Sequence, residues 1–230
     1  MLTRLLPLLL VVNSYAIETR IKIGIIDTGI KLNSNIMPFL CEDGLKDFTN
    51  TGIHDTVGHG TNIAGIILDG LSPADYCLVV IKYKSNDQYL AALEYASKKQ
   101  LKFVNLSLSG TSAMHTEKRL LNKMGTDKTV ITVAAGNDSL NLSKLCPVYP
   151  ACYGKSIPYM FVVGARDHIK SNYKGPVNTY ELGRNVCGLG ICLSGTSQAT
   201  AVFMNKLIRS GRYLAGGNTN ESTTKETNRN

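Results

Sequence analysis

The stretch Lys22-Ile23-Gly24-Ile25-Ile26-Asp27-Thr28-Gly29 is a short run of β-branched residues that ends in polar and small residues. A continuous apolar run of this length, bounded by turn formers, is typical of a strand that is buried on both faces. Asp27 and Gly29 are residues that favour turns, so we expect the strand to end there. This stretch therefore predicts a buried strand followed by a turn.

Similar strands alternate with helices along the rest of the chain. We expect strands over residues 77–83, 101–106, 129–134 and 159–163, and helices over residues 59–68, 87–99, 116–124 and 197–208. The helix over 87–99 has Leu90, Leu93 and Ala96 on one face, with Asn86 or Asp87 as its N-cap. This alternation predicts an α/β fold with a doubly wound, mainly parallel sheet and helices on both faces.

Several polar residues lie where these strands end or these helices begin. Asp27, Ser107 and Asn137 follow expected strands, whereas His59 and Ser197 lie at expected helix N-termini. Sites in open parallel sheets form beyond the carboxyl ends of the strands. We therefore expect these five residues to meet at one edge of the sheet.

Three motifs contain an aspartate, a histidine and a serine, in that order. They are Ile25-Ile26-Asp27-Thr28-Gly29, Gly58-His59-Gly60-Thr61 and Gly195-Thr196-Ser197-Gln198-Ala199-Thr200-Ala201. Catalytic triads of acyl-transfer enzymes recur on unrelated folds in different chain orders. With this order and these motifs, the chain resembles the subtilisin-like serine proteases (subtilases) over about residues 22–208. The resemblance implies a subtilisin-like fold and a serine endopeptidase.

The resemblance also implies a role for each residue. Ser197 would be the nucleophile, His59 the base, and Asp27 the carboxylate that orients the imidazole. The segment Ala134-Ala135-Gly136-Asn137 is similar to the family segment that carries an oxyanion asparagine, so the Asn137 amide and the Ser197 backbone N–H would bind the oxyanion. A lone glycine-rich turn with a serine is more often a helix cap. The prediction therefore depends on the motifs taken together.

An extended peptide that binds as an added strand is the substrate that the resemblance implies. The residues expected to bind it are Ser107, Leu108, Ser109, Ala134, Ala135, Gly136 and Val148. Subtilisins that accept bulky residues have glycine at the positions of Ser109 and Val148. We therefore expect a narrow pocket that prefers small residues before the cleaved bond. The Tyr149–Pro150 peptide bond is expected to be cis, like its equivalent in the family.

The chain has six cysteines, an even number that favours disulfides in an exported protein. Proximity in sequence pairs Cys146 with Cys152 and Cys187 with Cys192, which leaves Cys41 with Cys77, although six cysteines allow 15 connectivities. A zinc site is the alternative, but the spacings are long and no histidine clusters with them. No acidic cluster matches the calcium loop of many relatives, so we expect no essential metal and no cofactor.

Residues 1–16 have the pattern of a secretory signal peptide. Arg4 precedes an apolar run over residues 5–12 that is too short to span a bilayer, and small residues precede a cut after Ala16. We therefore expect a secreted or periplasmic protein without a membrane span; an uncleaved anchor or a buried first strand is the alternative. Residues 17–212 would form the peptidase domain, without a recognisable propeptide, and residues 213–230 a polar, disordered tail.

The formal net charge is +8, but the basic residues are scattered and do not alternate with aromatic residues as in a nucleic-acid platform. We therefore expect a monomer whose partners are polypeptide substrates and not nucleic acids. Two alternatives stay open: a dedicated processing peptidase with few substrates, and a catalytically inactive peptide-binding module. The presence of Asp27, His59, Asn137 and Ser197 argues against the inactive module. An α/β-hydrolase esterase would need Gly-x-Ser-x-Gly, which is absent around Ser197.

Overall fold

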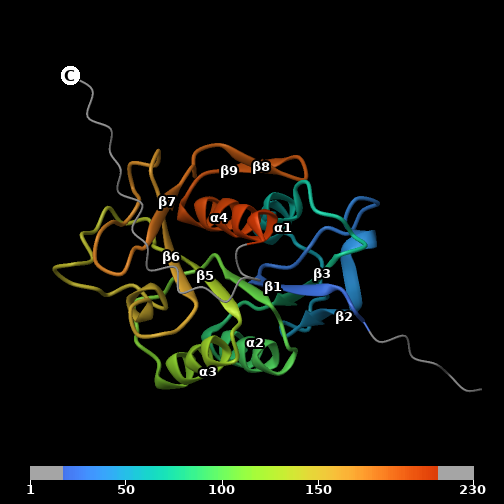
Figure 1. Cartoon of the computed structure of the whole chain (residues 1–230), viewed down its shortest axis with the longest axis horizontal. Coiled ribbons are helices and arrows are strands. Elements are labelled where there is room, and N and C mark those ends of the chain that lie inside the picture. Colours follow the sequence, from blue (N-terminus) through green and yellow to red (C-terminus); the bar gives the residue numbers. More distant parts are fainter. Residues whose placement is uncertain (1–17, 212–230) are drawn as a thin grey trace, which may run out of the picture.

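A computed structural model describes residues 18–211 of the chain, so the expected signal peptide and polar tail lie outside the described residues. Within them, one parallel sheet of seven strands has the order β2-β3-β1-β4-β5-β6-β7 (Figure 1). The strands are β1 Ile21–Asp27, β2 Leu40–Asp47, β3 Tyr76–Lys82, β4 Phe103–Leu106, β5 Val130–Ala134, β6 Met160–Ala165 and β7 Thr179–Glu181. A separate antiparallel hairpin joins β8 (Val186–Gly188) to β9 (Ile191–Leu193).

The helices lie on both faces of the sheet, as the sequence predicted. They are α1 His59–Leu68, α2 Asn86–Lys98, α3 His115–Thr126 and α4 Thr196–Ser210, with short 3-10 turns η1 at Met37–Phe39 and η2 at Ala151–Tyr153. Figure 1 shows α1 and α4 on one face and α2 and α3 on the other. In the part of the chain that the structure describes, no helix combines the length and the apolar character needed to cross a membrane.

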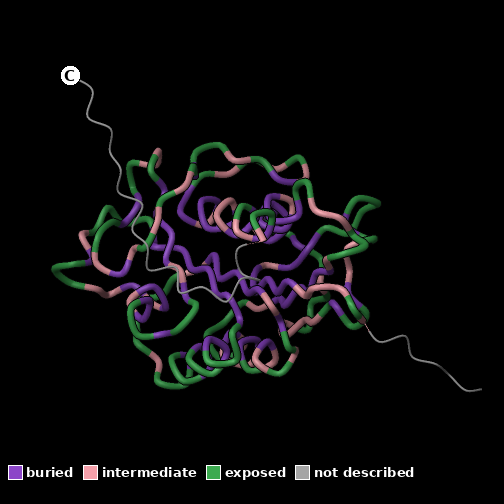
Figure 2. Tube along the Cα trace, in the orientation of Figure 1, coloured by how far each residue is buried: buried purple, intermediate pink, exposed green. Residues whose placement is uncertain are grey.

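Each face of the sheet packs against its own pair of helices. Ile23 and Ile25 of β1 belong to the core beneath α1 and α4, whereas Ile26 belongs to the core beneath α2 and α3. Figure 2 shows the central strands buried along their length, between helices whose inner faces are buried. The apolar run around Ile25 is continuous because both faces of this strand are covered. The doubly wound α/β fold is thereby confirmed.

The order of the strands brings the ends of β1 and β4 together. From β1 the chain builds β2 and β3 on one side, and then crosses to the other side to form β4 to β7 in turn. Ligand crevices of open parallel sheets form at the carboxyl ends of the strands where the order reverses. Ile25 lies opposite Asn105 in this pair, so Asp27 at the end of β1 is level with Ser107, directly after β4.

Two local predictions need correction. The N-cap of α2 is Ser85, and not Asn86 or Asp87: its side chain accepts from Gln88 N–H, and the Gln88 side chain accepts from Ser85 N–H. This capping box satisfies two backbone donors, whereas the Ser85 side chain alone would satisfy only one. The sequence analysis also missed β2, β7 and the β8–β9 hairpin. In β2 the polar pair Glu42-Asp43 and Gly44 interrupt the apolar pattern, and the pairing with β3 shifts register there.

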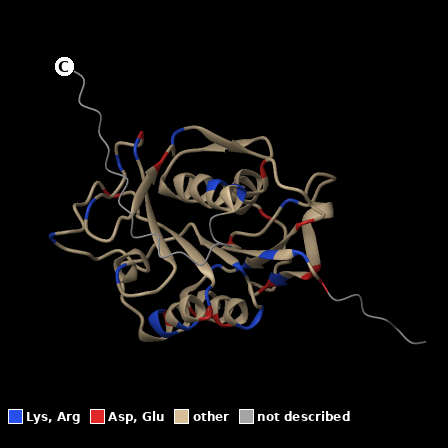
Figure 3. Ribbon diagram, viewed as in Figure 1, with Lys and Arg blue, Asp and Glu red and all other residues tan. Residues whose placement is uncertain are grey.

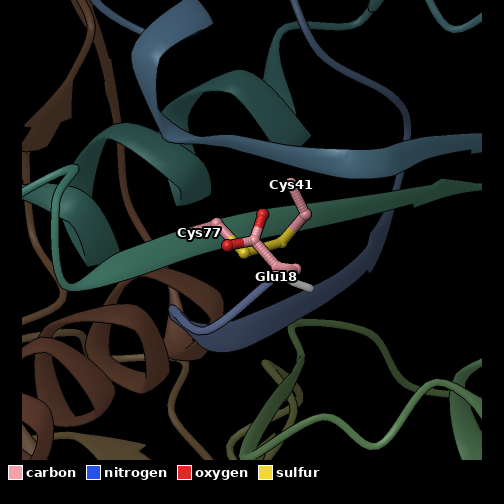
Figure 4. Close-up of side chains that lie close together, drawn as sticks. All are labelled: Glu18, Cys41 and Cys77. Carbon is pink, nitrogen blue, oxygen red and sulfur yellow. A yellow bond between two sulfur atoms is a disulfide. The ribbon is translucent and has the colours of Figure 1, made fainter. Parts of the chain in front are cut away.

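The six cysteines form the three pairs that proximity suggested: Cys41–Cys77, Cys146–Cys152 and Cys187–Cys192. Glu18 lies against the Cys41–Cys77 bond (Figure 4). The sulfur atoms are bonded to each other, and Arg20 donates two side-chain hydrogen bonds to the Glu18 carboxylate, which lower its pKa to about 2. Because the two sulfur atoms are bonded to each other and the Glu18 carboxylate is bonded to Arg20, Glu18, Cys41 and Cys77 offer no metal site while the disulfide is intact. Figure 3 shows basic residues spread over several elements, with acidic residues among them.

Candidate active site

Asp27 and His59 form a hydrogen-bonded pair at the carboxyl edge of the sheet. Asp27 is the last residue of β1 and His59 is the first residue of α1. The His59 Nδ1 atom lies 2.8 Å from Asp27 Oδ1 and 3.0 Å from Asp27 Oδ2. Gly60 allows this approach, because a Cβ there would lie 2.3 Å from the Gly29 carbonyl oxygen. The pair leaves the other ring nitrogen, Nε2, available for proton transfer.

A second buried carboxylate, Asp55, shapes the loop before His59. It accepts hydrogen bonds from the backbone N–H groups of Val57, Gly58 and Thr61 and from the hydroxyl groups of Thr28 and Thr61, at 2.6–3.0 Å. Burial opposes the ionised form of Asp55, but these hydrogen bonds outweigh it and lower the pKa of the carboxyl group. Asp55 therefore holds the first turn of α1 in place as an anion.

The environment of His59 favours its protonated form. Burial disfavours the imidazolium, but the hydrogen bond to Asp27 and the negative charges of Asp27 and Asp55 outweigh burial. The net effect raises the pKa of His59 above its ordinary value of 6.5. The ring is thus a stronger base than a free histidine, and a positive charge formed on it is compensated.

Ser197, the second residue of α4, is hydrogen-bonded to Ser107, directly after β4. The Ser197 hydroxyl donates to the Ser107 carbonyl oxygen at 3.2 Å, and the Ser107 hydroxyl donates to the Ser197 carbonyl oxygen at 3.0 Å. Among the described residues, no hydrogen bond joins the Ser197 hydroxyl to the His59 ring. Catalytic hydrogen bonds of ligand-free enzymes are often made only when substrate binds.

One hydrogen bond connects the first turns of α1 and α4. The Gln198 side-chain amide donates to Asn62 Oδ1 at 2.9 Å, and both side chains are buried. Asn62 in turn donates to the carbonyl oxygens of Val186 and Ile191 in the β8–β9 hairpin. His59 is the first residue of α1 and Ser197 is the second residue of α4, and these two helices lie side by side (Figure 1). Asn62 therefore supports the junction between the two helices and the hairpin.

The side-chain amide of Asn137 has a fixed orientation. The backbone N–H of Thr196 donates to Asn137 Oδ1 at 2.9 Å, and because an N–H needs an oxygen acceptor, the Asn137 NH₂ group must point elsewhere. Thr196 also accepts, through its hydroxyl, from Gly136 N–H at 3.1 Å. The loop after β5 is thereby bonded to the start of α4. Ser197 is the second residue of that helix, where backbone N–H groups have no intrahelical acceptor.

The expected pocket residues lie at the ends of β4 and β5 and in the loops that follow them. Ala134, Ala135 and Gly136 are buried at the end of β5, Leu108 is half-buried, and Ser109 is exposed. Gly110 pairs with Tyr149 through two backbone hydrogen bonds, and the Tyr149–Pro150 bond is cis, as expected. Val148 is 4% exposed, and a Cβ at Gly136 would lie 3.0 Å from its Cγ1 atom. The Val148 side chain therefore fills space against the Gly136 backbone.

Sequence reasoning missed several residues that support this edge. They are Thr28, Asp55, Lys82, Asn172 and Thr196. Asn172 is fully buried and bonds the backbone of Ala135, Asp138 and Leu140, which shapes the loop around Asn137. Asp55, four residues before His59, could have been noticed because it lies close to the histidine motif in sequence. Asn172 follows no pattern, and only the fold brings it to the loop.

Comparison with known proteins adds to this geometry. Residues 18–224 match the model of the Subtilase family. Subtilisin DY from Bacillus licheniformis is 31% identical over 166 residues, which are 66% of this chain and 58% of that protein. The chain therefore spans less than two thirds of this relative.

Solved structures are similar in fold. A lanthipeptide protease has a TM-score of 0.67 at 17% identity, covering 80% of this chain and 71% of that one. A cold adapted subtilisin-like serine proteinase also has a TM-score of 0.67, at 19% identity, covering 84% of this chain and 75% of that one.

Proposed function

Because the chain belongs to the subtilase family, we propose that it is a serine endopeptidase with the triad Asp27, His59 and Ser197. The observation that carries the proposal is the Asp27–His59 pair, with 2.8 Å between Oδ1 and Nδ1, at the carboxyl edge of the sheet, together with the position of Ser197 in the first turn of α4. A buried carboxylate on one imidazole nitrogen fixes the tautomer and stabilises the imidazolium. An inactive peptide-binding module would have no physical need for this pair.

In the first half of the reaction, Ser197 Oγ attacks the carbonyl carbon of the substrate, and its proton moves to His59 Nε2. The carbonyl π bond becomes an oxyanion, to which the Asn137 NH₂ group and the Ser197 backbone N–H donate. The C–N bond then breaks and His59 returns its proton to the leaving amine. An acyl-enzyme on Ser197 remains.

In the second half, a water molecule attacks the acyl-enzyme and gives a proton to His59. The same donors bind the second oxyanion, and the ester bond to Ser197 Oγ breaks as His59 returns the proton to that oxygen. The products are the original serine and a carboxylic acid, which releases its proton to water and leaves as a carboxylate. In the resting protein, the Ser197 hydroxyl donates to Ser107, so it must turn toward His59 before it attacks.

Activity should appear as the pH rises through the pKa of His59, which lies above the ordinary histidine value of 6.5. The base must be neutral to accept a proton, and a raised pKa keeps the protonated, inactive form to higher pH. The acid limb of kcat/KM against pH reports this group in the free enzyme. Circular dichroism over the same range controls for unfolding, and a limb below 6.5 would contradict the role of Asp27 and Asp55.

We expect peptides to bind in extended form beside Ser107, Leu108 and Ser109, at the open rim after β4. Main-chain pairing of this kind gives affinity, and pockets for side chains give specificity. The pocket for the residue before the cleaved bond would have Gly136 as a wall and Val148 at its floor. The contact of Val148 with the Gly136 backbone supports a pocket for small side chains.

Replacing Val148 with glycine should open this pocket. We expect the ratio of kcat/KM for phenylalanine substrates to that for alanine substrates to rise by about tenfold or more. A difference of one methylene group in an apolar pocket already changes kcat/KM by about this factor. Val148→Ala should give an intermediate ratio. Matched peptides that differ only in this residue provide the measurement. Wild-type protein that cleaves after phenylalanine faster than after alanine would show that the pocket is not narrow.

A fluorophosphonate probe, which reacts covalently with activated serines, tests the proposed function. Wild-type protein should be labelled at Ser197, with a rate that falls as His59 becomes protonated. Ser197→Ala should not be labelled, whereas the control Ser97→Ala, on helix α2, should react like the wild type. Equal labelling of wild type and Ser197→Ala, or no labelling of either, would overturn the proposal.

We also propose that the protein is exported and that residues 1–16 are removed. Amino-terminal sequencing of the protein recovered outside the cytoplasm of a bacterial expression host should begin at Ile17. The three disulfides agree with an oxidising destination. Recovery only of a cytoplasmic chain that begins at Met1 would contradict export.

A further inference from the structure

A buried lysine lies beside the Asp27–His59 pair, and the reaction described above does not use it. Lys82 is the last residue of β3, it is 8% exposed, and it lies directly opposite Asp27 in the sheet. Its Nζ atom donates to Thr51 Oγ1 at 3.1 Å, to Gly52 O at 2.7 Å and to His54 O at 2.8 Å. All three donors of the ammonium group are therefore bonded to one short loop.

Asp47 also bonds the backbone of this loop. This residue ends β2 opposite Lys82, and its carboxylate accepts from the backbone N–H groups of Thr49, Thr51 and Gly52 at 2.8–3.0 Å. Burial opposes its ionised form, but these hydrogen bonds and the charge of Lys82 lower the pKa of Asp47. The loop thus has its N–H groups bonded to an anion and its carbonyl groups bonded to a cation.

This loop is stacked onto the strand end that carries Asp27. Gly29 has a φ of +111°, and a Cβ there would lie 2.3 Å from Ile53 O and 3.1 Å from the Lys82 Cδ atom. Backbone hydrogen bonds join Ile30 N–H to Ile53 O and Asp55 N–H to Ile30 O. The loop then continues into Asp55, which bonds the first turn of α1. Lys82 therefore holds the loop that packs against the end of β1, next to Asp27, and that continues into Asp55, before His59.

We infer that Lys82 is a positioning residue of the active site, whose ammonium group orders the loop of residues 48–54 as a bound cation would. The inference rests on the proposed function, because it assigns Asp27 and His59 their catalytic roles. Lys82 touches neither substrate nor the reacting atoms. It acts by holding the loop against Gly29 and Asp55, so that the His59 ring keeps its orientation.

If Lys82 only stabilises the fold, we expect a different result from its replacement. Its loss would lower the melting temperature but leave turnover unchanged in the molecules that are folded. A positioning residue instead lowers kcat in folded protein, because a misplacement of about 1 Å can cost about a hundredfold. Lys82→Met keeps most of the side-chain volume without the charge. Lys82→Ala leaves space for a small ammonium ion from solution.

The experiment measures kcat, KM and the rate of fluorophosphonate labelling of both variants below their melting temperatures. We expect kcat and labelling of Lys82→Met to fall by about tenfold to a hundredfold, with KM within about twofold of the wild type. Methylammonium should restore activity to Lys82→Ala but not to Lys82→Met. Tetramethylammonium, which carries the charge without N–H donors, should not restore it. The control Lys84→Met removes a charge from an exposed lysine two residues away and should react like the wild type.

Nuclear magnetic resonance provides a second readout. The Nδ1 proton of His59, bonded to Asp27, should give a low-field resonance in the wild type that broadens or shifts in Lys82→Met and returns with methylammonium in Lys82→Ala. Folded Lys82→Met with wild-type kcat, or rescue by both ammonium ions alike, would overturn the role of Lys82 alone. A wild-type protein that the probe does not label would overturn the proposed function, and with it this inference.

Discussion

Replacing His59 with alanine should lower kcat by on the order of 10⁶-fold, a magnitude measured on a subtilisin and carried over to this chain. Without the imidazole, no base near Ser197 takes the proton of its hydroxyl group, and no acid protonates the leaving amine. The remaining rate would come from binding and the oxyanion donors alone. Steady-state hydrolysis of a peptide substrate, corrected for traces of wild-type enzyme, provides the measurement.

The loss should not be additive within the triad. Residues that act as one unit lose most of their effect when any one is removed. The double variant His59→Ala, Ser197→Ala should therefore be no slower than either single variant. The control is His115→Ala, which removes an exposed histidine at the start of α3 and should leave kcat unchanged. A His59→Ala variant that keeps more than about a tenth of wild-type turnover would exclude His59 as the base.

Asn137→Ala should lower kcat by about 10²–10³-fold with little change in KM, again a magnitude measured on a subtilisin. An oxyanion exists only in the transition state and the intermediate, so loss of its donor affects turnover and not ground-state binding. The variant also removes the acceptor of the Thr196 N–H, and this structural effect needs a separate control.

Asn137→Asp provides that control. An aspartate keeps an acceptor for Thr196 N–H but has no NH₂ group, and its negative charge repels the oxyanion. If donation to the oxyanion matters, Asn137→Asp should lose at least as much activity as Asn137→Ala. If support of Thr196 matters, Asn137→Asp should keep most of its activity, which would contradict the proposed role. Asn141→Ala, in the same loop, should behave like the wild type.

The helices and central strands were predictable because their patterns are local. The helix over residues 59–68 was predicted with the bounds that α1 has, since apolar residues at helical spacing follow the Gly58-His59-Gly60-Thr61 motif. The buried strand around Ile25 was predicted from its continuous apolar run, and in the structure both of its faces are covered. By contrast β2, β7 and the hairpin of β8 and β9 are short or irregular, and their partners are distant in sequence.

The prediction that Asp27, His59 and Ser197 share one edge came from their positions at the ends of expected strands and the starts of expected helices. Asp27 and His59 lie 32 positions apart and are bonded in the fold, because β1 ends where α1 begins. The hydrogen bonds that hold this edge could not be predicted in the same way. The bond between Gln198 and Asn62 spans 136 positions, and the bond between Asn172 and Ala135 spans 37. No periodic pattern connects such residues.

From the sequence alone, the class of sheet could be predicted, the three motifs could be read in order, and proximity suggested the cysteine pairs among 15 possible connectivities. These features depend on apolar periodicity and on short motifs, which are local properties of the chain. The tertiary structure was needed to show that Lys82 and Asp47 bond the same loop and that Asp55 bonds the first turn of α1. It was also needed to show that the Ser197 hydroxyl donates to the Ser107 carbonyl oxygen. A buried polar group must find its partners wherever the packed backbone offers them, and those partners are set by the fold and not by their distance along the chain.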